Sequence, residues 1–126
     1  GVVYFPDKKL DVFFITLNKS EKFFSSSTMY HDYAINDTLF HWQSQSTTSE
    51  SSPTGQRYIH HNERGSAVLL FVREFNKIQN ISQPFLCLGT ARYERHSGSR
   101  PMSIVWRLDE PIPGGYMKKA KVGSGG

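Results

Sequence analysis

Short apolar runs recur along the chain, and polar or turn-forming stretches separate them. Each run is rich in aromatic and β-branched residues and is too short for a buried helix, which is typical of strands. The run at 67–75 is apolar enough to be buried on both faces, and we expect it to pair with 85–94 as a hairpin. Gly89 interrupts the run at 85–94 and predicts a β-bulge or a close backbone approach. In all, the pattern predicts five strands, at residues 10–17, 39–43, 67–75, 85–94 and 102–108.

Helical signals are scarce in this pattern. The hydroxyl residues 25–28 precede a short periodic segment and predict a helix at 29–34, and a helical turn is expected at 55–62. Residues 44–54 have almost no apolar side chains and predict a long loop, a kind of segment that often carries function. The fold class that follows is mainly β: a small curved sheet or a β-barrel with one or two short peripheral helices.

The 126 residues are enough for one domain with its own core. We interpret residues 1–9 as a lead-in and residues 10–113 as a single β-rich domain. Residues 114–126 are interpreted as a flexible tail, because their Gly/Ser-rich end resembles an expression scar.

The positive charge is concentrated in the second half of the chain. The formal net charge is +4; residues 1–60 hold five basic and six acidic groups, whereas residues 61–126 hold ten basic and five acidic groups. A basic half is compatible with a polyanionic partner as well as with an ordinary solvated surface. Cys87 is the only cysteine, which fits a reducing, cytoplasmic compartment, and its apolar neighbours predict a buried small hydrophobe. No apolar run is long enough to suggest a membrane partner.

Signals for catalysis are weak. His60 and His61 are adjacent, so on a helix their side chains would diverge and chelate one metal ion poorly. Phosphate-binding, zinc-binding and serine-nucleophile motifs are absent from the sequence. We therefore predict a chain without catalytic residues, metal or cofactor, which is not itself an enzyme. A metal-dependent nuclease that uses His60, His61 and Glu63 or Glu74 remains an alternative.

Signals for recognition are stronger, because arginine, amide and aromatic side chains occur close together in the later strands and turns. Arginine forks onto phosphate or guanine, amides bond to base edges, and aromatic rings stack on bases. The candidate phosphate or base contacts are Arg57, Arg73, Arg92, Arg95, Arg100, His41, Gln43, Ser44 and Gln45. The candidate pocket aromatics are Trp42 and Tyr58, with Tyr30, Tyr33 and Tyr93. Trp42 fits a core position equally well, and Trp106 is predicted to be core.

Several segments together resemble a family. The chain is similar, over roughly residues 10–113, to an uncharacterised domain at the C-terminus of bacterial DEAD/DEAH-box helicase-like and restriction proteins. This resemblance implies an intracellular, bacterial nucleic-acid-processing or defence machine with a separate ATP-dependent motor, in which an accessory domain selects DNA. The segments that carry it are 14–22 (FITLNKSEK), 28–35 (TMYHDYAI), 39–46 (LFHWQSQS), 52–59 (SPTGQRYI), 70–74 (LFVRE) and 98–108 (GSRPMSIVWRL).

A second likeness concerns architecture. The order of a Phe-Phe-Ile strand, a short helix, a Trp-containing strand, an apolar strand and a Gly-interrupted strand resembles the PUA-like barrels, including their YTH and EVE members. Such barrels often hold a modified base in an aromatic pocket. The likeness implies Trp42 as the pocket residue, with Tyr30, Tyr33 or Tyr58 as partners, although the full set of YTH cage tryptophans is absent.

The sequence thus predicts a specificity module of a helicase or restriction protein that binds DNA, preferably duplex DNA with a modified base or backbone. A protein-interaction or autoinhibitory domain that docks on the helicase core of its own chain is the second alternative, beside the nuclease.

Overall fold

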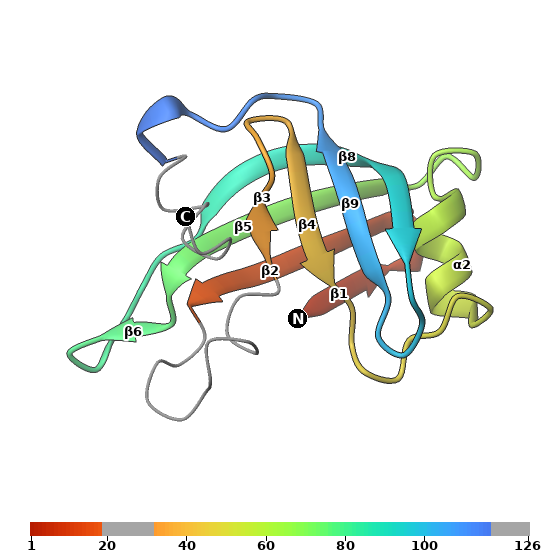
Figure 1. The fold of residues 1–126 in the computed structure, drawn as a ribbon, viewed down its shortest axis with the longest axis horizontal. Coiled ribbons are helices and arrows are strands. Elements are labelled where there is room, and N and C mark those ends of the chain that lie inside the picture. Colours follow the sequence, from red (N-terminus) through yellow and green to blue (C-terminus); the bar gives the residue numbers. More distant parts are fainter. Residues whose placement is uncertain (19–31, 117–126) are drawn as a thin grey trace.

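One curved, mixed sheet of seven strands forms most of the structure (Figure 1). The computed structural model describes residues 1–18 and 32–116. The strand order is β1-β2-β5-β8-β9-β4-β3; β2 and β5 run parallel and the other neighbours run antiparallel. A separate two-stranded hairpin, β6–β7, projects from one end of the sheet (Figure 1). The elements are β1 (Val2–Phe5), the 3-10 helix η1 (Pro6–Lys8), β2 (Leu10–Asn18), β3 (Tyr33–Ala34), β4 (Leu39–Gln43), α2 (Pro53–His60), β5 (Ala67–Phe75), β6 (Lys77–Ile78), β7 (Ile81–Ser82), β8 (Leu86–Ser97) and β9 (Ser103–Leu108).

The mainly β prediction is confirmed in its curved-sheet form, with short helices at the periphery. The PUA-like closed barrel is wrong, because the sheet ends at β1 on one side and at β3 on the other, and these two strands do not pair. The physical reason is their length: β1 has four residues and β3 only two, too few to build a ladder across the opening.

Most predicted strands form as expected. β4 and β5 have the predicted bounds, and β5 pairs antiparallel with β8. The bulge expected at Gly89 is present: the register shifts opposite Leu70 and Phe71, and Gly89 has φ +87°, a left-handed conformation that suits glycine. A second register shift lies between Tyr93 and Arg95. Because of it, Arg95 rather than Glu94 lies opposite Val105.

The ends of the chain and the connections differ from the sequence prediction. The lead-in expected at residues 1–9 contains β1 and η1, since the apolar Val2–Phe5 pairs with β2. The helix predicted at 29–34 is wrong at its end, where Tyr33 and Ala34 form strand β3. Residues 29–31 of that prediction lie outside the described residues. The part of the predicted tail after Tyr116 lies outside them too. The β6–β7 hairpin was not predicted, because its two-residue strands carry no periodic signal.

Helix α2 begins two residues before the predicted turn. The Ser52 hydroxyl accepts a hydrogen bond from the Gly55 N–H, and Pro53 occupies the first turn, where its missing N–H costs nothing. Gly55 is required for packing, because a Cβ there would lie 2.0 Å from the Ser49 carbonyl oxygen. The cap and the glycine hold α2 against the end of the curved sheet, to the right in Figure 1.

An aromatic cluster fills the concave face of the sheet. Phe13 lies at its centre, with ring centroids 4.5 Å from Trp42, 5.5 Å from Tyr58 and 5.3 Å from Trp106. The rings come from β2, β4, α2 and β9, so the cluster joins both halves of the sheet to the helix. Trp106 is fully buried, which confirms its predicted core position.

The Tyr58 hydroxyl in this cluster predicts a loss of stability at high pH. Burial, with a smaller contribution from the Asp11 carboxylate, raises the pKa of Tyr58 from 10.0 to about 12. A raised pKa in the folded state means that stability is fully present below pH 10 and is lost as the pH rises toward 12. The loss is about 2–3 kcal/mol. We expect Tyr58→Phe to remove that part of the slope in urea denaturation series between pH 9 and 11.5. Wild-type and variant slopes that coincide would contradict this expectation.

Candidate functional site

Arginine side chains gather on the convex face of the strands β8, β9 and β4. In cross-strand register, Arg92 of β8 lies opposite Arg107 of β9, and Arg95 lies opposite Val105. Val105 in turn lies opposite His41 of β4, which lies opposite Tyr33 of β3. Neighbouring strands are roughly 4.8 Å apart, so these rows bring the side chains within contact range of one another. We call Arg92, Arg95, Arg107, His41 and Tyr33 the arginine face.

The ion pairs on the arginine face are exposed. Arg92 lies 3.4 Å from Asp109, and Arg107 donates to Glu94 over 2.9 Å. Hydrogen bonding from Arg107 holds the pKa of Glu94 below its usual value, and the same bond raises the pKa of Arg107. The side chains of Arg92 and Arg107 are 64% and 50% exposed, and solvent-exposed pairs contribute little to stability. A stronger anion such as phosphate can therefore compete for both guanidinium groups.

Two flat rings continue the arginine face toward the edge of the sheet. The His41 imidazole stacks on the Tyr33 phenol with centroids 4.7 Å apart and an interplanar angle of 16°. Both side chains are partly exposed. A solvent-facing stacked pair beside guanidinium groups is a surface on which a further planar group can stack.

A pocket of about 200 Å³ opens at the gap in the sheet, where β1 and β2 face the end of β4. We call it the gap pocket. Its lining on the β4 side consists of Asp32, Trp42, Gln43, Ser44 and Gln45. The Asp32 carboxylate is almost fully buried and accepts a hydrogen bond from the Gln43 N–H over 2.9 Å. Gln43 belongs both to this lining and to the convex side of β4, so the gap pocket borders the arginine face.

The structure separates the predicted pocket aromatics. Tyr58 is fully buried and Trp42 is only 6% exposed, because both pack against Phe13 in the core. They do not form an open aromatic cage; Trp42 contributes only to the lining of the gap pocket. Tyr33 joins the arginine face, and Tyr93 points its hydroxyl at His96 Nδ1, 2.6 Å away. Tyr30 lies outside the described residues.

Arg57 and Arg73 hold the fold together. Arg57 donates two 2.9 Å hydrogen bonds to the fully buried Asp11 carboxylate and stacks over the Tyr4 ring. Burial lowers and the Asp11 bonds raise the pKa of Arg57, with a net increase. Each guanidinium nitrogen of Arg73 donates a hydrogen bond, and the group lies 4.2 Å from the Phe85 ring centroid. Neither guanidinium faces solvent as an open phosphate contact.

The remaining predicted contacts differ in exposure. Arg100 is exposed in the β8–β9 turn, where its φ is +57° and its N–H donates to the Thr48 carbonyl. The Ser44 hydroxyl is committed to the backbone, since it donates to the Gln45 carbonyl and accepts from the Met102 N–H. The Gln45 side chain is exposed at the edge of the gap pocket.

The residues of the nuclease alternative do not converge on one site. His61 is buried; its Nδ1 lies 2.9 Å from the Ser66 carbonyl oxygen and its Nε2 accepts the Tyr93 N–H. His60 contacts Glu63, while Glu74 lies on β5 and lines a different pocket. Within residues 1–18 and 32–116, no group of three His, Cys, Asp or Glu side chains could hold a metal ion.

The sequence prediction was wrong for Cys87 and did not identify Arg107 or Asp32 as site residues. Cys87 is exposed rather than buried, because it lies opposite Phe71 on the convex face next to the bulge. Arg107 was not singled out, although its alternation with Trp106 on a predicted strand was a signal that it faces outward. Asp32 had no such signal, since its place in the gap pocket depends on contact with β4. No helix in the described part of the chain is long and apolar enough to cross a membrane.

A family model matches the chain. The family model described as a domain of unknown function (DUF3427) covers residues 2–119, nearly the whole chain. None of the curated proteins matches the sequence.

Proposed function

This chain belongs to the DUF3427 family, and from its surface chemistry we propose that it is a DNA-binding module whose arginine face contacts the DNA backbone. The observation that carries the proposal is that Arg92 lies opposite Arg107 and that Arg95, opposite Val105 in the next row, is exposed with them. Guanidinium groups release counterions when they bind phosphates, which makes such a surface a general polyanion site.

The stacked His41 and Tyr33 rings support the same function. They lie at the end of the row that starts at Arg95, so a DNA strand that follows this row meets the Arg95 guanidinium first and the planar rings next. Phosphate contacts position the nucleic acid, and rings accept unstacked bases. The arginine face therefore suits a DNA segment with at least one base turned out of its stack.

The gap pocket supports recognition of that base. A volume of about 200 Å³ lies below the roughly 300–1,000 Å³ of ordinary ligand sites, which favours one small planar group. The Asp32 carboxylate can accept from the exocyclic amino group of cytosine or adenine, and Gln43 offers an amide beside it. We propose that a chemically modified base, rather than a modified backbone, is selected here. In this proposal the domain is the specificity module of a bacterial, cytoplasmic helicase or restriction protein.

Arg92→Gln, Arg95→Gln and Arg107→Gln together should weaken DNA binding and lower the slope of log affinity against log salt by about 2–3. This estimate allows roughly 0.9 for each lost phosphate contact. The measurement is fluorescence anisotropy with labelled single-stranded and duplex DNA of one sequence at several salt concentrations. Arg64→Gln is the matched control, because Arg64 is an exposed arginine in the turn after α2 and does not belong to the arginine face. It should leave the slope nearly unchanged.

The same assay separates the parts of the proposal. Duplexes with a methylated base, with a phosphorothioate backbone and without modification test selective reading, and equal affinity for all three would refute it. Asp32→Asn should reduce the preference for the modified base while the arginine-dependent salt slope stays. If wild-type protein fails to bind any DNA at low salt, the DNA function is wrong.

A further inference from the structure

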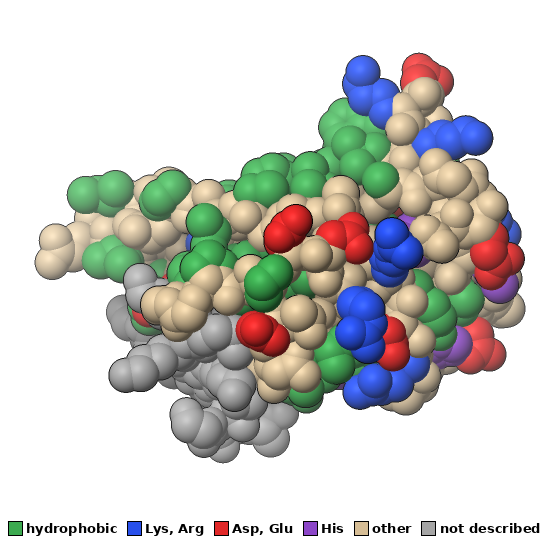
Figure 2. Space-filling view, turned by 90° about the horizontal axis from the view of Figure 1, so that it is seen from above, with side chains coloured by type: hydrophobic (Ala, Val, Ile, Leu, Met, Phe, Trp, Pro, Cys, Tyr) green, Lys and Arg blue, Asp and Glu red, His purple; other side chains and the backbone are tan. Residues whose placement is uncertain are grey.

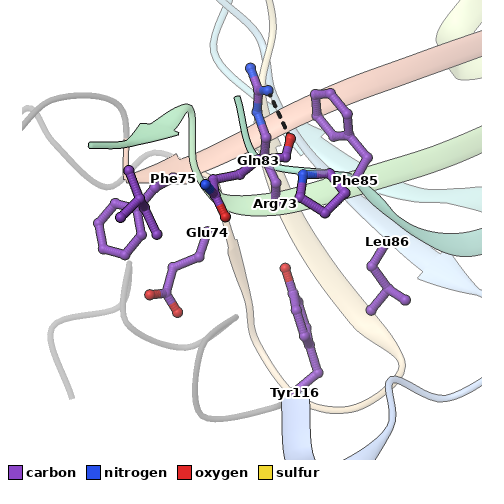
Figure 3. Close-up of a pocket in the computed structure, with 9 residues that line it drawn as sticks. Arg73, Glu74, Phe75, Gln83, Phe85, Leu86 and Tyr116 are labelled. Carbon is purple, nitrogen blue, oxygen red and sulfur yellow. Dashed lines mark hydrogen bonds between the residues drawn. The ribbon is translucent and has the colours of Figure 1, made fainter. Parts of the chain in front are cut away.

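A further pocket lies at the end of the sheet opposite α2, where β5 ends and the β6–β7 hairpin begins (Figures 1 and 3). Its volume is about 390 Å³, within the range of ordinary ligand sites. Its walls are mainly apolar and come from Phe75, Ile78, Phe85, Leu86 and Tyr116. We call it the hairpin pocket. None of its lining residues belongs to the arginine face or to the gap pocket.

The two charged residues of the hairpin pocket are not equivalent. The Arg73 guanidinium is held by the Thr16 hydroxyl, the Gln83 carbonyl and the Asn76 side chain. Its hydrogen-bond donors are thus occupied within the fold, although these partners are neutral and leave the positive charge in place. Figure 3 shows Arg73 with Phe85 on one side of β5 and Glu74 with Tyr116 on the other.

Glu74 is therefore the charged group that the hairpin pocket offers to a ligand. Its side chain is partly buried and makes no hydrogen bond or ion pair with any residue of the described ranges. Burial raises the pKa of Tyr116, and the nearby Glu74 carboxylate raises it further, which places the negative charge close to the phenol. A partly desolvated carboxylate among apolar walls is stabilised by a cation that enters the pocket.

The rim of the hairpin pocket is apolar and exposed. Ile78 and Leu86 line the pocket and are 48% and 37% exposed, and Ile81 on the facing hairpin strand is 65% exposed. On the face that Figure 2 shows, green apolar side chains line the described part of this end, whereas Lys and Arg side chains gather toward the α2 end. Exposed apolar groups around a concave site are typical of protein contacts.

We propose that the hairpin pocket binds an arginine side chain of a protein partner, presented between apolar neighbours. The guanidinium pairs with Glu74 and lies against the Tyr116 ring, and the apolar neighbours cover Ile78, Ile81 and Leu86. A guanidinium can combine an ion pair with stacking on a ring, which an ammonium group does less well. Nucleic acid is a less suitable occupant, since its phosphates would meet the Glu74 carboxylate on the side of β5 where Tyr116 lies. This inference is independent of the DNA proposal.

The test is a titration of the 126-residue chain with acetyl-Leu-Arg-Phe-amide, followed by ¹H–¹⁵N correlation spectra. The matched peptide carries citrulline in place of arginine, which keeps the shape and removes the charge. We expect the arginine peptide to shift the amide signals around Glu74, Leu86 and Tyr116, and the citrulline peptide to bind about fivefold more weakly, as for one partly exposed ion pair.

Variants then locate the contact. Glu74→Gln should reduce affinity for the arginine peptide to that of the citrulline peptide, while its thermal unfolding and its DNA binding stay as in the wild type. Arg95→Gln should leave peptide binding unchanged. Equal affinity for both peptides, an unchanged affinity after Glu74→Gln, shifts that cluster elsewhere, or no shifts at millimolar peptide would each overturn the proposal.

Discussion

Replacing Arg57 with leucine should destabilise the domain by about 3–5 kcal/mol, the usual cost of leaving one partner of a buried ion pair alone. Asp11 is fully buried on β2, and both of its oxygens accept from Arg57. Without the guanidinium, the carboxylate must either lose its charge or draw water into the core. The measurement is the free energy of unfolding from urea titrations at pH 7.

Arg57→Lys and Arg64→Leu are the informative controls for this substitution. Lysine keeps the charge but cannot form the two-pronged bond, so we expect an intermediate loss of stability. Arg64 is exposed in the turn after α2, and its replacement should have a small effect. The double variant Asp11→Leu/Arg57→Leu should recover most of the loss, because no buried charge remains. A loss below about 1 kcal/mol for Arg57→Leu would show that the pair does not hold α2 on the sheet.

Replacing Trp42 with alanine should also destabilise the domain by about 3–5 kcal/mol, as for other large aromatic side chains in a core. Trp42 is 6% exposed and its ring lies 4.5 Å from Phe13 and 5.5 Å from Tyr58, measured between centroids. Trp42→Phe should cost less, since most of the ring contacts remain. Thermal and urea unfolding measure both effects.

This prediction also decides between the two interpretations of Trp42 that the sequence left open. A tryptophan that serves only as a stacking platform for a base would lose DNA affinity on replacement and keep its stability. From its packing we expect the opposite for Trp42→Phe: a measurable loss of stability and nearly unchanged affinity for unmodified DNA. A stable Trp42→Ala variant that no longer discriminates modified duplexes would favour the aromatic-pocket interpretation.

The proposed DNA site and the proposed peptide site use different parts of one sheet. The arginine face lies on β8, β9 and β4, while the hairpin pocket lies where β5 and β8 diverge. The two charges differ as well, with exposed guanidinium groups at one site and a carboxylate at the other. A module of this kind could bind DNA and a protein partner at the same time.

Strands were predictable wherever burial and alternation act locally. β4 alternates partly exposed and buried residues, and β5 does so over most of its length, so the run of apolar and β-branched residues was sufficient to place their ends. The bulge at Gly89 was predictable for the same reason, since a glycine inside a strand has few other uses. β1 and β3 were missed because such short strands exist only through the neighbour with which they pair.

The roles of individual arginines were not predictable in this way. Arg57 and Arg73 look like surface cations in the sequence, yet one binds a carboxylate 46 positions away and the other a hydroxyl 57 positions away. Arg107 was overlooked, although its cross-strand neighbours make it part of the arginine face. A guanidinium has the same local sequence signature whether it faces solvent or an internal anion.

The sequence by itself determined the β-rich class, the main strands and the positive charge of the second half, because these depend on residue type and short-range periodicity. Only the tertiary structure decided that the sheet stays open, that Trp42 and Tyr58 fill the core, and which arginines are exposed to solvent. Those outcomes depend on strand order and on contacts between residues far apart in the chain. The free energy of such contacts cannot be inferred from the local pattern of apolar and polar residues.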